Sequence, residues 1–196
     1  MGPNMTLMSR VKAIMLDPDS EWRVIADEPG GVTYLFTRYV AILALIPALA
    51  GFIGYSIIGV SVSAGTFRVP LVPGLINMAL SYVFTFVIVY AVALVVDTLA
   101  TSFRAERHFP NALKLAVYSF TPVWLAGIFI LIPGLSFLSI LGLYGLYLIW
   151  TGLTPLMGSP RDKSFFYALT VLAAAIVVTI VLAIVQNTIA SIPRPY

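Results

Sequence analysis

The sequence contains no cysteine and a single histidine, His108, in 196 residues. The lack of cysteine excludes disulfides, thiolate metal sites and cysteine nucleophiles. One histidine is too few for an ordinary zinc site, which needs several histidine, cysteine or carboxylate ligands. No nucleophile–base pair and no phosphate-cradling loop is recognisable either. The sequence therefore predicts a chain that is not an enzyme and that binds no metal and no cofactor.

Charged residues are also scarce. They make up 10% of the chain, whereas 60% is hydrophobic and the mean hydropathy is +1.01. Ordinary soluble domains are about 25% charged and about 45–50% apolar, so this composition places the chain in a bilayer. A spanning helix needs about 20 apolar residues, and five stretches are long enough. They cover residues 39–60, 71–96, 115–132, 135–157 and 165–185. The sequence thus predicts an all-α integral membrane protein, a bundle of five transmembrane helices.

Only Pro133 and Gly134 separate the third stretch from the fourth. Neither residue sustains a helix interior, so we expect a tight helical hairpin at this point. A single long helix over residues 115–157 is the competing interpretation.

Positive charges are distributed unevenly between the two ends of the predicted bundle. Nine of the eleven lysines and arginines fall before the first stretch or in the loops that follow the second and fourth stretches. Only Arg68 and Arg194 fall on the other side. Lysine and arginine concentrate on the cytoplasmic side of membrane proteins. The count predicts a cytoplasmic N-terminus and an outside C-terminus. A bacterial inner membrane is the simplest location, although the same rule also fits eukaryotic endomembranes.

A charged leader, residues 5–31, precedes the first apolar stretch, and residues 1–4 before it are expected to be a cloning remnant. In its first half, apolar residues recur at helical spacing, with Arg10 and Lys12 beside them. These apolar residues are Leu7, Met8, Val11, Ile14 and Met15. The pattern predicts an amphipathic helix that lies in the membrane interface on the cytoplasmic side.

The second half of the leader opens with the segment LDPDSEW. Asp17 suits the N-cap position of a helix, and Pro18 suits its first turn. Trp22 and Ile25 then share one face. We therefore expect helix over residues 7–27, with Trp22 at the level of the lipid headgroups. The candidate residues for interfacial or partner contact are Arg10, Lys12, Trp22 and Ile25.

Several segments resemble a known membrane protein family. The leader pattern Pro18…Trp22-Arg23-Val24-Ile25 is followed by LIPALAGFIGYSIIG, AVYSFTPVWLAGIFILIPGL and LGLYGLYLIWTGL. Together these segments resemble the bacterial branch of the Yip family, the Ypt/Rab-interacting five-span membrane proteins. The resemblance implies five helices and a cytoplasmic N-terminus. The resemblance covers about residues 10–185 of the chain. We expect a Yip-like membrane domain of residues 32–190, followed by a tail of residues 191–196.

Eukaryotic members of this family act in vesicle trafficking and bind Rab GTPases or each other. The eukaryotic DLYGP box is absent from this sequence, and LDPDSEW occupies a similar place. A bacterial cell also lacks Rab proteins. We therefore expect no binding of Rab GTPases, and the resemblance supplies no activity that transfers to particular residues.

A few polar residues in or near the predicted spans are candidates for lining a solute path. They are Asn77, Ser81, Thr85, Asp97, Tyr144 and Tyr147. The first three are spaced by four on the second span, and Asp97 is the only acid close to a span. Polar stripes of this kind more often join helices to one another. Asp97 also fits a solvated helix-end carboxylate paired with Arg104 or Arg107.

Two functions remain open. The first is a non-enzymatic membrane protein that organises the bilayer or partner proteins. The second is a small channel or transporter whose path is lined by the polar residues of the second span. The middle of every span lacks lysine, arginine, aspartate and glutamate, which favours the first function, because ion paths keep such groups at membrane depth. The expected partners are the lipid bilayer and either further copies of this chain or other membrane proteins, with no nucleic acid.

Overall fold

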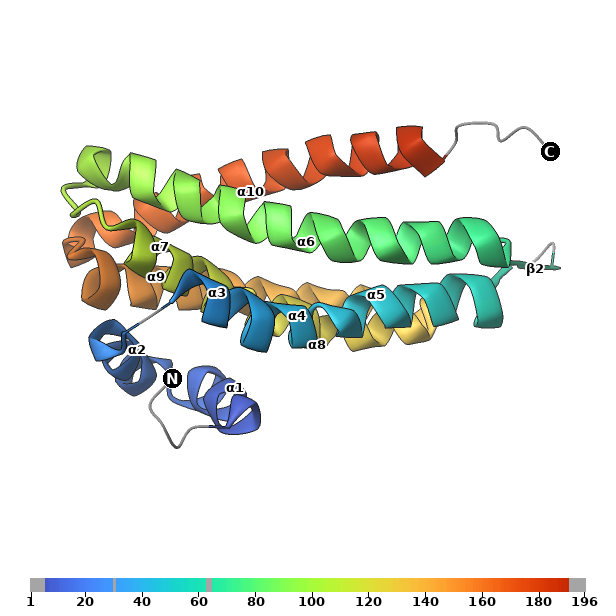
Figure 1. Ribbon diagram of the computed structural model, residues 1–196, viewed down its shortest axis with the longest axis horizontal. Coiled ribbons are helices and arrows are strands. Elements are labelled where there is room, and N and C mark those ends of the chain that lie inside the picture. Colours follow the sequence, from blue (N-terminus) through green and yellow to red (C-terminus); the bar gives the residue numbers. More distant parts are fainter. Residues whose placement is uncertain (1–5, 30, 63–64, 191–196) are drawn as a thin grey trace.

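The computed structural model describes residues 6–29, 31–62 and 65–190. The predicted cloning remnant, residues 1–4, and the predicted tail, residues 191–196, lie outside these ranges. Long helices run side by side in a bundle, and two short helices lie against one end of it (Figure 1). We call this end the leader end, and the opposite end, which carries a β-hairpin, the hairpin end.

The leader consists of two helices, α1 (Leu7–Leu16) and α2 (Pro18–Asp27). Asp17 stands between them as the N-cap of α2, where its Oδ1 accepts a hydrogen bond from the N–H of Ser20 at 3.4 Å. This contact satisfies one of the amide groups that a helix start leaves without a partner. The predicted helix start at Asp17 is confirmed, and the same residue divides the predicted leader helix into two.

The first span is one continuous helical segment from Val32 to Ile58. Two of its turns are wound more widely, as π-helix. Its parts are α3 (Val32–Tyr34), η1 (Leu35–Val40), α4 (Ala41–Leu43), α5 (Leu45–Phe52) and η2 (Ile53–Ile58).

A two-stranded antiparallel hairpin follows the first span. It consists of β1 (Val60–Val62) and β2 (Gly65–Phe67), with Ser61 paired to Thr66. The chain enters β1 through Gly59, whose φ of 89° is accessible mainly to glycine. The hairpin was not predicted, because strands of three residues leave no alternating pattern to detect.

Four further spans complete the bundle. The second is α6 (Leu71–Leu99) with η3 (Ala100–Phe103); the third is α7 (Phe109–Ser119), α8 (Thr121–Ala126) and η4 (Gly127–Leu131); the fourth is η5 (Pro133–Leu143) and α9 (Tyr144–Met157); the fifth is α10 (Arg161–Ala190). All five helical segments are long and apolar enough to cross a membrane. The prediction of an all-α protein with five spanning helices is therefore confirmed.

The third and fourth spans form the predicted hairpin. Helix η4 ends at Leu131 and η5 begins at Pro133, and the turn is closed by a hydrogen bond from the N–H of Leu135 to the carbonyl of Ile132 at 2.7 Å. The two segments then pack along each other. The competing single helix over residues 115–157 is wrong, because the chain reverses direction at Pro133.

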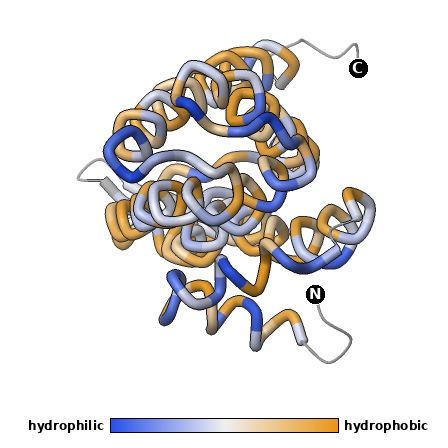
Figure 2. Tube along the Cα trace, turned by 90° about the vertical axis from the view of Figure 1, so that its left-hand side faces the viewer, coloured by the Kyte–Doolittle hydropathy of each residue, from blue (hydrophilic) through white to orange (hydrophobic). Residues whose placement is uncertain are grey.

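The third span lies at the centre of the bundle. Every residue from Ala112 to Ser119 on α7 is buried, and 67% of its apolar window is buried, against 17–33% in the other spans. Figure 2 looks onto the leader end and shows hydrophilic residues gathered in the leader and the loops there, whereas the helices are mostly hydrophobic. The outer spans therefore leave most of their apolar surface for lipid.

Candidate functional site

A buried arginine joins the two leader helices to each other and to the bundle. Arg10 on α1 is fully buried, and its guanidinium forms ion pairs with Glu21 on α2 and with Glu28 just beyond it. The guanidinium carbon also lies 5.6 Å from the ring centre of Tyr118 on α7, a cation–π distance. Buried charges persist only when they are paired. This cluster therefore holds α1, α2 and α7 in one arrangement.

The cluster changes the acid–base behaviour of its members. Burial raises the pKa of the Glu21 carboxyl above its ordinary value, although the nearby Arg10 acts in the opposite direction. Burial alone would lower the pKa of Arg10, but Tyr118, Glu21 and Glu28 together outweigh it and raise that pKa. Arg10 therefore stays positively charged, and Glu21 takes up a proton more readily than an exposed glutamate does.

A buried lysine secures the end of α2. Lys114 on α7 donates hydrogen bonds from Nζ to the backbone carbonyls of Ile25 at 2.9 Å and Glu28 at 2.6 Å. The last carbonyls of a helix have no partner within it, and a cation there is favourable. Lys114 thus satisfies polar groups that a docked helix would otherwise bury without partners.

Trp22 is the central apolar contact between leader and bundle. Its side chain is fully buried, its Nε1 donates to Oγ1 of Thr151 on α9 at 3.2 Å, and its ring meets the ring of Tyr118 edge-on at 6.4 Å. The expected contact of Trp22 with lipid is wrong, because its side chain is fully buried between α7 and α9. Its depth relative to the lipid headgroups stays a prediction. Arg10, also expected at the interface, is likewise buried.

The leader helices are therefore fixed to the bundle, and we call α1 and α2 in this position the docked leader. Of the four predicted contact residues, Ile25 is buried with Trp22 and Arg10, whereas Lys12 is exposed. Lys12 stands on an outward face of α1 between Met8 and Leu16, which are 71% and 73% exposed. The docked leader thus turns one apolar and basic face away from the bundle.

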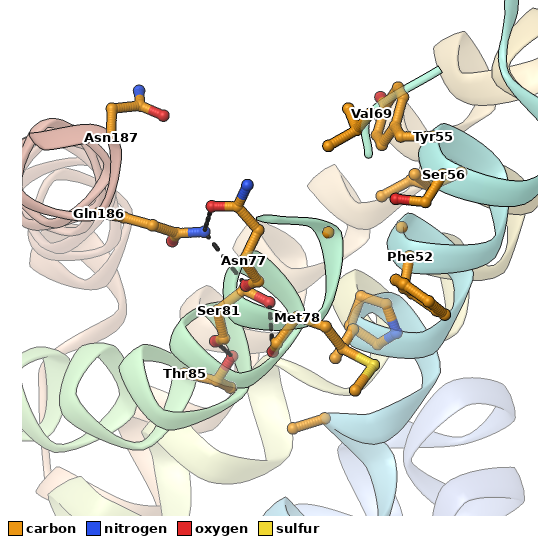
Figure 3. A pocket seen from close by; sticks show the side chains of 16 residues that line it. Phe52, Tyr55, Ser56, Val69, Asn77, Met78, Ser81, Thr85, Gln186 and Asn187 are labelled. Carbon is orange, nitrogen blue, oxygen red and sulfur yellow. Dashed lines mark hydrogen bonds between the residues drawn. The ribbon is translucent and has the colours of Figure 1, made fainter. Parts of the chain in front are cut away.

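A second feature is a pocket of about 400 Å³ near the hairpin end, bounded by α5, η2, α6 and the last turns of α10. Asn77, Ser81 and Thr85 line it from α6, while Gln186 and Asn187 line it from α10 (Figure 3). Among the described residues, no charged side chain lines this pocket. The polar stripe of the second span therefore opens into a cavity suited to neutral polar groups.

Most hydrogen-bonding groups of this pocket already have protein partners. Ser81 and Thr85 each donate to a backbone carbonyl about one turn earlier, at 2.9 Å. Gln186 Nε2 donates to the carbonyl of Asn77 at 3.3 Å and so joins the second span to the fifth. In this pocket the hydroxyl of Ser56 is buried without a hydrogen-bond partner among the described residues. Of the three stripe residues, only Asn77 joins two helices, as polar groups in membrane spans commonly do, whereas Ser81 and Thr85 bond within α6.

Aromatic side chains fill the bundle between this pocket and the leader end. The ring of Tyr39 lies 4.8 Å from that of Tyr118 and 6.3 Å from that of Trp124, and all three side chains are buried. The hydroxyl of Tyr39 is hydrogen-bonded to that of Thr121 at 2.8 Å. On α6, Val89 is fully buried one turn beyond Thr85. The polar pocket therefore ends against a packed core.

The remaining candidates for a solute path lie at the leader end, away from this pocket. The hydroxyl of Tyr144 donates to the backbone carbonyl of Met15 at 3.2 Å and so holds the end of α1. Tyr147 lines a separate pocket between α2, α9 and α10. Asp97 accepts a hydrogen bond from Nη2 of Arg107 at 2.8 Å. The structure does not bring the six candidates together, and it gives Asp97 one of its two predicted partners.

The sequence indicates Arg10, Trp22 and Ile25 as contact residues of the leader, but it does not indicate the residues that hold them. Lys114 stands out in it only as a positive charge beside a loop, and nothing in the sequence marks Glu28. Gln186 was placed just beyond the fifth span. Its position as one of the few amides in an apolar stretch was a usable signal, since polar groups at membrane depth seek partners. Within the described residues, no group of three histidine, aspartate or glutamate side chains could hold a metal ion.

Comparison with known proteins gives a consistent result. Residues 12–182 match the family model described as the Yip1 domain. The chain is 26% identical over 182 residues to relatives with the name Inner membrane protein YohC, from Escherichia coli strains K12 and O6:H1. The alignments cover 89% of this chain and 92% of each relative. No solved structure gives a significant match.

Proposed function

This chain belongs to the Yip1 domain family, and from that premise we propose that it is a non-enzymatic membrane protein that organises the bilayer or partner membrane proteins through its docked leader. The proposal depends chiefly on one observation. Met8, Lys12 and Leu16 form an outward face on a helix that buried ion pairs hold against the bundle. A face of this composition suits the boundary between headgroups and acyl chains, or an apolar surface of another membrane protein.

The proposal includes a location and an orientation. The Escherichia coli relatives are named as inner membrane proteins, which supports the same location for this chain. Nine of its eleven lysines and arginines lie at the leader end of the bundle: in the leader, at the start of the first span, in the loop after α6, and in the first turns of α7 and α10. Because such residues concentrate on the cytoplasmic side, the docked leader faces the cytoplasm.

A small channel or transporter is the second candidate function. The observation in its favour is the polar pocket that contains Asn77, Ser81 and the hydroxyl of Ser56, which has no hydrogen-bond partner among the residues described. Two observations count against it. No charged residue in the part of the chain that the structure describes lines the pocket, and the packed aromatic side chains of Tyr39 and Trp124 lie between it and the leader end. A path for ions would need charged or strongly polar groups along its whole length.

Reconstitution separates the two candidates. Purified protein in liposomes should show little flux of ions or small solutes and should self-associate. Asn77→Ala should leave both properties unchanged. Saturable flux that Asn77→Ala abolishes would overturn the proposal and establish the transporter.

In cells, a photo-crosslinking side chain at Leu16 should form adducts with lipid or with membrane proteins. The same group at Asp162, which is exposed at the start of α10 and away from α1, serves as the control. Equal crosslinking from both positions would contradict a specific role for the outward face of α1.

A further inference from the structure

A second pocket, also of about 400 Å³, lies at the leader end between α2, α9 and the first turn of α10. Two arginines line it from different elements, Arg23 from α2 and Arg161 from the start of α10. Both are exposed, and neither has an ion pair or side-chain hydrogen bond within the part of the chain that the structure describes. Two such cations around one concavity create a positive potential that attracts an anion. We call this site the arginine pocket.

The level of the arginine pocket matches that of the lipid headgroups. Arg161 is the first residue of the fifth span, so it stands where a spanning helix leaves the membrane. Trp150 and Tyr147 line the pocket from α9 and are 42% and 37% exposed. Tryptophan and tyrosine are enriched at this depth because one part of each ring system is apolar and another is polar. The pocket therefore borders both water and the headgroup layer.

The polar groups of the pocket suit a phosphate oxygen. Arginine binds phosphate through paired N–H groups in a fixed planar fork. The indole N–H of Trp150 and the hydroxyl of Tyr147 have no hydrogen-bond partner among the described residues and supply further donors. The positive end of the α10 dipole adds to the attraction, because α10 is a 30-residue helix that begins here.

The charge of the pocket limits the ligand further. Asp19 also lines it, so the two arginines are opposed by one carboxylate and the pocket has a formal charge of +1. A phosphodiester carries one negative charge and matches this value. A volume of about 400 Å³ lies within the range of about 300–1,000 Å³ that is usual for small-molecule sites.

We propose that the arginine pocket binds a phosphate group between Arg23 and Arg161. Two sources share this chemistry, the headgroup of an anionic phospholipid and a small phosphate compound from the aqueous side. In either case the bound phosphate bridges α2 to α10 and adds a contact that holds the docked leader. This inference goes beyond the proposed function and does not depend on it.

Calorimetric titration of the delipidated full-length protein in a neutral detergent tests the proposal. The probes are dioctanoyl phosphatidylglycerol, dioctanoyl phosphatidylcholine and inorganic phosphate. Arg23→Gln and Arg161→Gln should each weaken binding by about fivefold or more, since each removes a charge-assisted hydrogen bond. Asp19→Asn should tighten binding, because it removes the opposing charge. Raising the salt concentration should weaken binding to the unmodified protein.

Lys163→Gln is the matched control. Lys163 belongs to the same turn of α10 and carries the same charge, but it does not line the pocket. Its substitution should change the affinity by less than about twofold, as expected for a screened surface charge. Circular dichroism melting of each variant checks that the fold is intact, which is expected because Arg23 and Arg161 are both exposed.

The outcomes distinguish the two sources. Arginine-dependent binding of phosphatidylglycerol alone identifies a lipid headgroup, and arginine-dependent binding of inorganic phosphate identifies an aqueous ligand. The proposal is overturned if neither probe binds, if phosphatidylcholine binds as well as phosphatidylglycerol, or if binding survives in the Arg23→Gln/Arg161→Gln double variant.

Discussion

Trp22 of the leader occupies space that exists because Gly152 of α9 has no side chain. A Cβ atom on Gly152 would stand 2.7 Å from Cε2 of Trp22 and 2.5 Å from Cδ1 of Leu115, both closer than real Cβ contacts. The neighbouring residue, Thr151, accepts the hydrogen bond from the indole. One turn of α9 therefore provides both the space and the polar partner for the largest side chain of the leader.

Gly152→Ala should consequently displace Trp22 and loosen the docked leader. Overpacking of a filled core typically costs about 1–3 kcal/mol. Release can be followed as the change in fluorescence of a dye attached at Ser20→Cys while the protein is heated. The label is specific because the chain has no other cysteine. Gly51→Ala is the matched control, because a Cβ there meets nothing within 4 Å. Equal melting temperatures for the two variants would contradict the tight fit.

Arg10→Met should release the leader more strongly, because it leaves the carboxylate of Glu21 buried without the arginine that pairs with it. Breaking a buried ion pair in this way costs about 3–5 kcal/mol. Lys12→Met removes the same charge from the exposed face of α1 and should stay within about 0.5 kcal/mol of the unmodified protein. Trypsin cleavage after the exposed Arg23 measures the difference. Comparable cleavage of both variants would show that the buried ion pairs do not hold the leader.

Docking of the leader should depend on pH through Glu21. Its pKa is raised above the ordinary 4.5, so the docked state binds a proton more readily than the released state does. This contribution is fully present at acid pH and decreases as the pH rises from about 4.5 through the raised pKa. Glu21→Gln should remove this part of the dependence. The test measures the temperature at which the leader is released, from pH 4.5 to 8, in the unmodified protein and in Glu21→Gln. The release temperature of the unmodified protein relative to Glu21→Gln should fall as the pH rises, and a relative increase with pH would contradict a raised pKa.

Cysteine labelling should report the orientation of the bundle. In intact cells, an impermeant maleimide should label Ser61→Cys in the β-hairpin and should not label Glu106→Cys in the loop after α6. Both side chains are exposed, so access depends on the side of the membrane alone. The reverse labelling pattern would invert the argument from charge.

The five spans could be predicted because long apolar runs have few alternatives to membrane helices. The hairpin at Pro133 and the cap at Asp17 were predictable for local reasons, since proline and aspartate act on the backbone beside them. These features need only neighbouring residues to be recognised.

The docked leader could not be predicted in the same way. An amphipathic pattern shows that Trp22 and Ile25 share a face, but it does not distinguish a face that meets lipid from one that meets α9. The charge of Arg10 suggested exposure, because its partner Glu28 is 18 residues away and no local pattern joins them. The scattering of the polar candidates could not be predicted for the same reason, namely that it depends on contacts between residues distant in sequence. The hydroxyl of Tyr144, for example, bonds to the backbone of Met15, which is 129 residues away.

Hydrogen exchange in the leader tests the central claim most directly, namely that α1 and α2 are part of the folded bundle. Helices of ten residues are marginal alone in water, where isolated helices shorter than about 12–15 residues are unstable. In nanodiscs, the amides of Trp22 to Ala26 should exchange slowly in the intact protein. They should exchange much faster in the Trp22→Ala variant and in a free peptide of residues 6–29 on the same nanodiscs. Exchange as fast in the intact protein as in the free peptide would contradict the docked leader and the function proposed for it.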